Sequence, residues 1–270
     1  MLLSEKKLSV IGAGQMGEAL VKGFIQSGVL EAKQILLSDV NIERLEFLRA
    51  KYQVELTTDN RKAAESGNII LLAVKPQQIE QVLTEIKEFF RIEQLLISIA
   101  AGIKTEKIYN VIDKDIPVVR VMPNTPALVG KGMSVISRGK YADRSSAEIA
   151  LKLFSSVGEV VELPENLQNQ ATAISGSGPA YFFLMVESLI EAGIKAGLDK
   201  DVAGKLVIQT MAGSAALLQE TGKNAGELRE MVTSPGGTTA AALQVFSKRE
   251  FQYIVQEAVK AAIKRAEELA

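Results

Sequence analysis

The first part of the chain alternates short, continuous apolar runs with stretches in which apolar residues recur at helical spacing. The apolar runs, each bounded by turn or capping residues, predict strands at 8–11, 35–38, 69–74, 95–99 and 118–122. The amphipathic stretches predict helices at 41–52 and 77–90. Two later strands are expected at 133–137 and 159–163, with a helix at 145–154 between them. Strands that are apolar throughout and separated by helices indicate a parallel sheet covered on both faces.

Near Pro164 this pattern gives way to helices, and from residue 166 onward no convincing strand is visible. Pro179 suits the first position of a helix over 180–196, which is apolar nearly all round at YFFLMV. Asp199 or Asp201 can cap the next helix, which runs to Thr221, and a last helix covers 251–269. We therefore predict an α/β protein: a Rossmann-type doubly wound sheet in residues 1–164, and an all-α domain in residues 165–270. A helix that is apolar on every side needs a partner subunit to cover it.

Composition narrows the function. Of the 270 residues 47% are hydrophobic, the net charge is −1, and the chain has no histidine and no cysteine. Such a charge favours neither nucleic acid nor an anionic membrane, and we expect no metal site and no disulfide. We see no signal peptide and no apolar stretch of the length that spans a bilayer. By default we expect a cytoplasmic protein.

The segment VIGAGQMGEAL places Gly12, Gly14 and Gly17 directly after the first predicted strand, in the pattern G-x-G-x-x-G. In dinucleotide-binding folds these glycines permit a tight turn, close approach to a pyrophosphate and close packing of helix on strand. The N–H groups at the start of the following helix can then bind the phosphates, which adds Ala13, Gln15 and Met16 to the site. The alternative is a tight strand-to-helix turn without a ligand.

The second predicted strand ends at Asp39, 22 residues after Gly17, where an acidic residue would accept hydrogen bonds from the adenosine ribose. A carboxylate here favours NADH and repels the 2′-phosphate of NADPH. Ser38 could contact either ribose form, and Arg44 could compensate for a phosphate, so NADPH is not excluded. The alternative for Asp39 is a solvated residue that caps the next helix.

Ligands of open α/β sheets gather at the carboxyl ends of the strands. Lys75 and Pro76 follow the third strand in AVKP, Ala101 follows the fourth, and Asn124 follows the fifth in MPNTP. Taken alone, Lys75 could be a surface lysine and Asn124 a turn-forming residue. The predicted cofactor-binding set is completed by Asn60, Ala73 and Val74.

The segment TSPGGTT, residues 233–239, interrupts the helical half. A helix that starts near Thr239 after Gly-Gly would offer free N–H groups to a carboxylate, and Ser234 and the threonines would add hydroxyl donors. The alternative is a plain turn between helices with Thr238 or Thr239 as N-cap.

In this order IGAGQMG, AVKP, MPNTP, SGSGPAY and TSPGGTT resemble the motifs of pyrroline-5-carboxylate reductase, from about Lys7 to Leu269. The resemblance implies an N-terminal Rossmann-type domain and a helical domain that forms a homodimer, which could assemble into a decamer. It also implies that substrate binds between the nicotinamide and the helical domain. The substrate loop would comprise Ser234, Gly236, Gly237, Thr238 and Thr239, with Thr239 hydrogen-bonded to the ring nitrogen. Members that favour NADPH typically carry a small polar residue at the position of Asp39.

This chemistry needs no histidine. A cyclic imine is basic and can arrive protonated, and its iminium carbon then accepts a hydride from NADH or NADPH. Holding the carboxylate and the ring nitrogen lowers the entropic barrier. A β-hydroxyacid dehydrogenase would need a lysine early in the helix after SGSG, and none occurs before Lys195. A reductase of related imines would carry the same motifs, whereas the intact SPGGTT argues against a dinucleotide-binding protein without catalysis.

Overall fold

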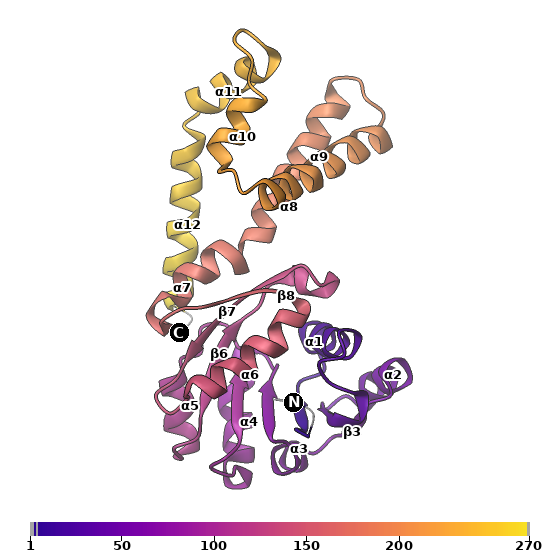
Figure 1. Ribbon diagram of the computed structural model, residues 1–270, viewed down its shortest axis with the longest axis vertical. Coiled ribbons are helices and arrows are strands. Elements are labelled where there is room, and N and C mark those ends of the chain that lie inside the picture. The colour runs from indigo at the N-terminus through magenta and orange to yellow at the C-terminus, as the bar shows by residue number, and fades with distance from the viewer. Residues whose placement is uncertain (1–2, 4, 269–270) are drawn as a thin grey trace. The chain divides into compact units, whose positions relative to one another are not determined.

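The computed structural model describes residues 3 and 5–268, and within them eight strands form one sheet in the order β3-β2-β1-β4-β5-β6-β7-β8 (Figure 1). The strands are β1 (Leu8–Ile11), β2 (Ile35–Ser38), β3 (Glu55–Thr57), β4 (Ile69–Leu72), β5 (Leu95–Ser98), β6 (Val118–Met122), β7 (Gly132–Arg138) and β8 (Gly158–Glu162). Strands β1 to β6 are parallel, whereas β7 is antiparallel to β6 and β8 is parallel to β7. The strand order reverses at β1, which lies between β2 and β4.

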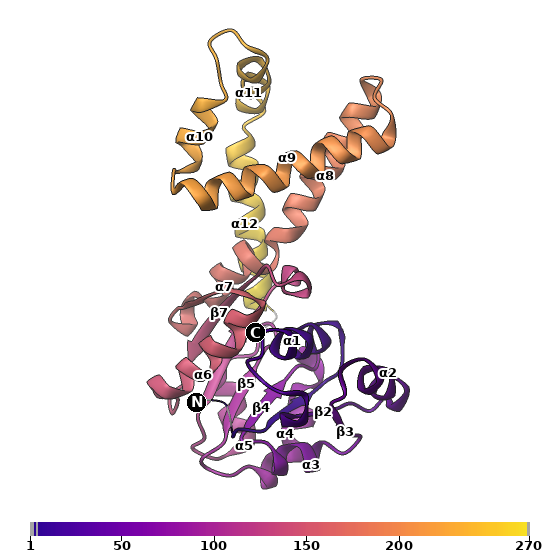
Figure 2. The same cartoon turned by 45° about the vertical axis from the view of Figure 1, so that its right-hand side comes forward.

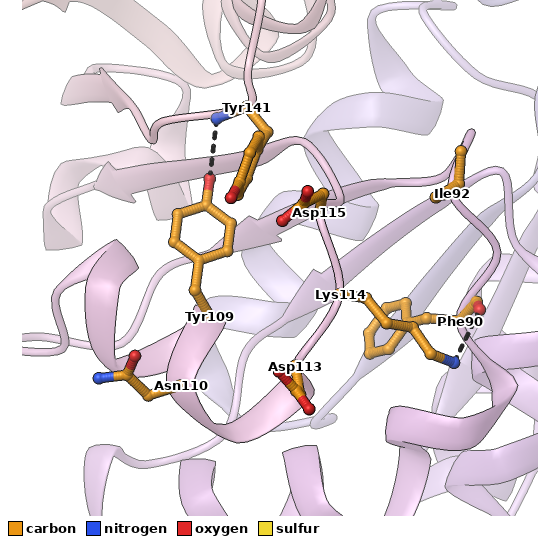
Figure 3. A pocket seen from close by; sticks show the side chains of 8 residues that line it. All are labelled: Phe90, Ile92, Tyr109, Asn110, Asp113, Lys114, Asp115 and Tyr141. Atoms are coloured by element: carbon orange, nitrogen blue, oxygen red, sulfur yellow. Dashed lines mark hydrogen bonds between the residues drawn. The ribbon is translucent and has the colours of Figure 1, made fainter.

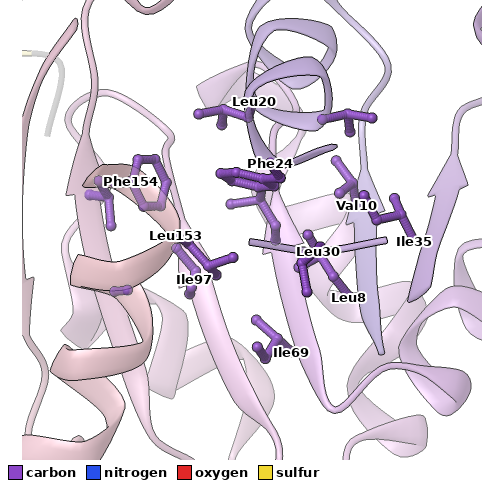
Figure 4. Packing of buried hydrophobic residues seen from close by; sticks show 14 of the residues in the cluster. Leu8, Val10, Leu20, Phe24, Leu30, Ile35, Ile69, Ile97, Leu153 and Phe154 are labelled. Carbon is purple, nitrogen blue, oxygen red and sulfur yellow. The ribbon is translucent and has the colours of Figure 1, made fainter. Parts of the chain in front are cut away.

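Helices cover both faces of this sheet, in accord with the sequence pattern. They are α1 (Gln15–Gln26), α2 (Ile42–Tyr52), α3 (Asn60–Ser66), α4 (Ile79–Ile86), α5 (Thr105–Ile112), α6 (Arg144–Phe154) and the short α7 (Gln168–Ala171). Along β1, Leu8 and Val10 pack into one core with α1, α2 and α6, while Ile11 belongs to a second core with α3, α4 and α5. Figure 2 labels these six helices around the sheet. In the first core Phe24 of α1 meets Phe154 of α6 edge to face, at 6.2 Å between ring centroids (Figure 4).

The second compact unit, Gly178–Ala261, consists of helices joined by turns. Its helices are α8 (Gly178–Lys195), α9 (Lys200–Thr221), α10 (Ala225–Met231), α11 (Thr238–Lys248) and α12 (Phe251–Glu268), the last of which ends in residues that group with the first unit. Asp199 caps α9 through its side chain, and Gly222 ends this helix with φ +63°. Two-domain architecture, an α/β sheet followed by helices, is thus confirmed.

The first unit extends beyond the predicted boundary at 164, as far as Ser177. Side chains after that boundary are hydrogen-bonded to the sheet, which explains the extension. Gln168 is buried and its Nε2 donates to the Val135 carbonyl at 3.1 Å. Glu165 accepts from the Thr105 N–H at 2.8 Å and pairs with Arg120 of β6 at 3.3 Å. Burial lowers the pKa of Arg120, an effect that the neighbouring Glu165 carboxylate opposes.

One helical run, Glu165–Lys195, is long and apolar enough to cross a membrane by length and composition, although we expected no such stretch from the sequence. Only 11% of its most apolar window is buried. A helix that subunit association buries is equally exposed when a single chain is considered. The exposure by itself therefore does not indicate a membrane.

Candidate functional site

The carboxyl ends of β1, β2, β4, β5 and β6 meet at one edge of the sheet because these strands are parallel. At this edge the chain turns sharply at Gly12, whose φ of +109° is a conformation that other residues rarely adopt. The turn is held by a hydrogen bond from the Gly12 N–H to the Ser38 carbonyl at 2.8 Å. The predicted glycine-rich loop therefore lies between the ends of β1 and β2, where α1 begins.

The three glycines of this loop differ in what surrounds them. A Cβ on Gly12 would lie 2.7 Å from the backbone carbonyl of Ala73, and a Cβ on Gly17 would lie 2.3 Å from the Gly12 oxygen. These two glycines are thus required by packing within the protein. A Cβ on Gly14 would meet no atom within 4 Å, and Gly14 is the N-cap of α1 without a side-chain cap. Open space over an uncapped helix N-terminus fits a pyrophosphate.

Asp39 is joined to the same loop. Its Oδ2 accepts from the Ala13 N–H at 2.7 Å, and its Oδ1 accepts from the Asn41 N–H at 2.9 Å. The side chain that caps α2 is Asn41, which accepts from the Arg44 N–H, so the alternative role of Asp39 as the N-cap is filled by another residue. The carboxylate is half-buried at the position where a ribose would be recognised.

Arg44 is engaged by protein groups near Asp39. Its Nε donates to the Ala13 carbonyl at 2.9 Å and its Nη2 pairs with Glu18 of α1 at 2.5 Å. Glu18 also accepts from Lys51 and from the Tyr52 hydroxyl, both at 2.9 Å. Partial burial alone would raise the pKa of Glu18, but the hydrogen bonds from Lys51, Arg44 and Tyr52 lower it to about 2. Glu18 is therefore ionised and compensates the charge of Arg44.

The other predicted residues fall into two groups. Ser38 and Asn60 are both buried, and the Ser38 hydroxyl donates to the Asn60 Oδ1 at 2.8 Å. Asn60 in turn donates to Glu85 at 3.0 Å. Ser38 and Asn60 thus stabilise the carboxyl edge of the sheet from the protein interior. The remaining predicted residues line the ends of β4 and β5: Ala73, Val74, Lys75, Pro76 and Ala101.

Asn124, after β6, has both ends of its amide occupied. Its Nδ2 donates to the Ser175 carbonyl at 2.9 Å, and its Oδ1 accepts from the Met133 N–H at 2.8 Å. Ser175 lies in a π-helical turn, Thr172–Gly176, that follows α7. Such turns are frequent at functional sites.

The second loop, TSPGGTT, adopts a tight turn before α11. The Gly237 N–H donates to the Ser234 carbonyl at 3.0 Å, and Gly236 between them has φ +70°. Proline followed by glycine with positive φ is the signature of a type II turn. The N-cap of α11 is Gly237 and makes no side-chain cap, so the alternative of Thr238 or Thr239 as N-cap does not apply. The N-terminus of α11 is left without a side-chain acceptor.

A cavity of about 990 Å³ lies within the first unit, beside the segments that lead into β5 and β6 (Figure 3). Tyr109 and Tyr141 meet edge to face there, with centroids 5.1 Å apart. Lys114 donates to the carbonyls of Lys87, Glu88 and Phe90 at 2.8–3.3 Å. Because the lysine is used for protein contacts and the amino edge of a parallel sheet is not where ligands gather, we do not assign the reaction to this cavity.

Sequence reasoning missed several of these features. The anchoring role of Glu18 was not foreseen, although an acidic residue in the first turn of α1 with two cations on the next helix was a usable signal. The link from Asn124 to Ser175 joins residues 51 positions apart and left no local pattern.

Comparison with known proteins connects both halves of the chain to enzymes. The family model described as "Pyrroline-5-carboxylate reductase dimerisation" matches residues 165–269, and the one described as "NADP oxidoreductase coenzyme F420-dependent" matches residues 7–102. A pyrroline-5-carboxylate reductase of Synechocystis sp. is 40% identical over 97% of this chain and 98% of its own. That of Corynebacterium melassecola is 41% identical over 97% of this chain and 98% of its own.

Solved structures show the same relationship. A pyrroline-5-carboxylate reductase from Coxiella burnetii superposes with a TM-score of 0.92 at 35% identity, covering 98% of each chain. A pyrroline carboxylate reductase from Plasmodium falciparum with NADP bound superposes with a TM-score of 0.88 at 33% identity, again covering 98% of each chain. Prephenate dehydrogenase from A. aeolicus, at 16% identity and a TM-score of 0.58, shares the fold alone.

Proposed function

Because the chain belongs to the pyrroline-5-carboxylate reductase family, we propose that it transfers a hydride from NAD(P)H to the C=N bond of 1-pyrroline-5-carboxylate. The product is L-proline, and the reaction is the last step of proline biosynthesis. The observation that carries the proposal is the presence, in one chain, of two glycine-containing loops that each lead into a helix without a side-chain cap. One is the glycine-rich loop before α1, and the other is the turn before α11.

The residues of the first loop fit a dinucleotide. Gly14, Gln15 and Met16 at the start of α1 would hold its pyrophosphate through backbone N–H groups, and Asp39 would hold the adenosine ribose. Residues at the ends of β4 and β5 would line the nicotinamide half, on the other side of the point where the strand order reverses. When bound, the cofactor supplies the hydride, and the protein supplies binding and orientation.

Within this site we propose that the protein prefers NADH. A 2′-phosphate would approach the Asp39 carboxylate, and like charges repel. The cation best placed to offset that repulsion, Arg44, is already paired with Glu18 and with the Ala13 carbonyl. The NADP found in the Plasmodium falciparum structure belongs to a relative at 33% identity and leaves the preference of this chain to measurement.

The second loop would bind the substrate. The uncapped N–H groups at the start of α11 suit its carboxylate, with Gly236 and Gly237 allowing close backbone approach and Ser234 and Thr238 adding hydroxyl donors. Following the family resemblance, the Thr239 hydroxyl would be hydrogen-bonded to the ring nitrogen and orient the ring. A substrate that arrives as the iminium needs no strong general acid from a chain that has no histidine and no cysteine.

The active form is proposed to be a homodimer, consistent with the dimerisation domain. Within the described part of Gly178–Ala261 the buried hydrophobic side chains are few, namely Ala203 and Leu228. In α8, by contrast, Phe182, Phe183 and Leu184 are 61%, 66% and 63% exposed. So much exposed apolar surface would be covered by a second copy. Assembly of dimers into a decamer and a cytoplasmic location stay predictions, and light scattering on the purified protein measures the first.

The reductase assignment is tested by mixing the protein with pyrroline-5-carboxylate and either NADH or NADPH, and following loss of the reduced cofactor and formation of proline. We expect consumption only when the imine is present. Absence of turnover with both cofactors would overturn the proposal. A parallel assay with NAD(P)⁺ and small β-hydroxyacids covers the alternative dehydrogenase, for which α8 has no lysine before Lys195.

A further inference from the structure

Pro179 removes a hydrogen bond that the backbone of a regular helix would make. In a regular α-helix the Ser175 carbonyl would accept from the N–H four residues later, but that residue is Pro179, which has no N–H. The chain around it forms a π-helical turn, in which the Ser177 N–H donates to the Thr172 carbonyl at 2.9 Å. Pro179 therefore cannot donate to the Ser175 carbonyl, and the donor found on this carbonyl is a side chain.

Asn124 supplies that donor from the carboxyl end of β6. Its Nδ2 lies 2.9 Å from the Ser175 oxygen, and its Oδ1 lies 2.8 Å from the Met133 nitrogen. The amide orientation is fixed chemically, because a carbonyl can only accept and a backbone N–H can only donate. One half-buried side chain thus joins the end of β6, the start of β7 and the π-helical turn.

The turn packs closely on the end of β6. A Cβ on Gly176 would lie 3.2 Å from the Met122 Cε and 3.2 Å from the Thr172 Cγ2, so the chain approaches the strand at a distance that a side chain would disturb. This end of β6 belongs to the edge that carries the cofactor loops, on the half opposite Asp39. In folds of this type that half receives the nicotinamide, and the Asp39 half receives the adenosine.

We propose that Asn124 is a positioning residue: by donating to the Ser175 carbonyl it holds the Thr172–Gly176 turn against β6 and so shapes the nicotinamide end of the cofactor site. This assignment rests on the proposed function, and it replaces the direct cofactor contact that we expected for Asn124. Pro179 contributes to the same arrangement, because without an N–H it leaves the Ser175 carbonyl available to the Asn124 side chain.

The substitution Asn124→Asp separates the two ends of the amide. It keeps the size of the side chain and an acceptor for the Met133 N–H, but it removes the donor to Ser175. Pro179→Ala restores a backbone N–H four residues after Ser175, so the double variant N124D/P179A recovers a donor from another source. Thr125→Asp is the matched control, since it adds the same charge at the neighbouring exposed position without touching the amide.

The experiment compares the affinities of NAD⁺ and ADP-ribose, which lacks the nicotinamide, by calorimetry on the full-length protein. We expect N124D to weaken binding of NAD⁺ about tenfold and of ADP-ribose less than about twofold, since one neutral hydrogen bond contributes up to about 1.5 kcal/mol. The double variant should recover most of the loss. T125D should change the affinities for NAD⁺ and ADP-ribose by the same factor. Equal losses for both ligands in N124D, or no loss, would show that Asn124 does not position the nicotinamide end.

Hydrogen exchange of the protein without cofactor gives an independent measurement. Amide protection in residues 172–178 should fall in N124D and return in N124D/P179A. Unchanged protection in N124D would contradict the role of Asn124 even if the wild-type protein proves to be an active reductase. Conversely, a loss of amide protection in N124D that N124D/P179A reverses would support the role of Asn124, even if pyrroline-5-carboxylate were not the substrate.

Discussion

The Asp39 carboxylate accepts a hydrogen bond from the Ala13 backbone N–H at 2.7 Å, which ties the end of β2 to the glycine-rich loop. The same loop residue accepts a hydrogen bond from Arg44 at its carbonyl. One acidic and one basic side chain thus hold both backbone polar groups of Ala13, beside the place where the adenosine ribose would bind.

Replacing Asp39 by serine should reverse the cofactor preference. We expect kcat/KM for NADH to fall about 10- to 100-fold, since a hydrogen bond to a charged group contributes about 1.5–3 kcal/mol, and the value for NADPH to rise as the repulsion disappears. Steady-state kinetics with both cofactors measure the ratio. Asp115→Ser, an exposed carboxylate beside the Tyr109 cavity, serves as the control and should leave the ratio unchanged. If D39S keeps the wild-type ratio of kcat/KM values for NADH and NADPH, Asp39 does not select the cofactor.

The pairing of Arg44 with Glu18 gives a second, dependent effect. In the D39S background, Glu18→Gln removes the compensating carboxylate, and NADP⁺ affinity should rise a further threefold to fivefold, about 1 kcal/mol for a partly exposed charge pair. Calorimetric titration with NADP⁺ measures this, with NAD⁺ as the reference ligand. If Arg44→Gln in the D39S/E18Q background fails to cancel the gain, the gain has another source.

Glu18 should also make stability depend on pH. Its pKa is lowered from 4.5 to about 2 in the folded protein, so its ionised form is favoured by folding. The stabilisation is therefore complete above about 4.5 and is lost as the pH falls towards 2. Urea unfolding of the wild-type protein and of E18Q should differ most at neutral pH and converge in acid. A difference that is constant across this range would mean that the carboxylate charge is not responsible.

Two glycines three positions apart should respond oppositely to alanine. Gly17→Ala would place a Cβ 2.3 Å from the Gly12 oxygen, and overpacking of this kind costs about 1–3 kcal/mol, seen as a lower Tm. Gly14→Ala meets no protein atom within 4 Å, so Tm without cofactor should be unchanged while dinucleotide affinity drops. Thermal melts with and without NAD⁺ separate the two outcomes. A G14A protein that binds as tightly as wild type would contradict the pyrophosphate assignment.

Thr239→Val removes one hydroxyl at nearly constant volume. We expect kcat/KM for the imine to fall about 10- to 100-fold, the range for one lost hydrogen bond of about 1.5–3 kcal/mol, with cofactor affinity unchanged. Thr233→Val is the matched control, because its hydroxyl donates to the Arg229 carbonyl at 2.6 Å and serves the end of α10. Full activity in T239V would leave substrate orientation to the backbone of the loop.

The sequence predicted the strands of the sheet closely where a run of apolar residues was bounded by turn residues. Leu8–Ile11, Ile35–Ser38 and Val118–Met122 were expected with the bounds that the structure has. The edge strand Glu55–Thr57 was missed, because three residues that are exposed or half-buried carry no apolar run. The antiparallel direction of β7 was also not predicted, since a strand's own residues do not encode its direction.

The site residues also differed in how far they could be predicted from the sequence. Glycines and the acidic residue at the end of β2 could be found because each occupies a fixed spacing in a local motif. Arg44 was recognised as a nearby cation, but its bonds to Glu18 and Ala13 depend on how α1 and α2 pack and could not be read from the chain. Asn124 was placed at the right edge, yet its partner Ser175 is set by the tertiary fold.

The helices α1 and α11 have glycine N-caps, and like α4 and α5 they begin without a hydrogen bond from the side chain of the N-cap residue. Asn41, Asp59, Asp143, Asp199 and Asn224 cap other helices through their side chains, whereas Gly14 and Gly237 leave the first turns of α1 and α11 without that support. The pyrophosphate and the substrate carboxylate would then take the place of the missing caps, so each ligand would finish a piece of secondary structure as it binds. The two loops would become more resistant to local unfolding as ligand concentration rises, and cellular supplies of cofactor and imine would set the lifetime of the folded protein as well as its rate of turnover.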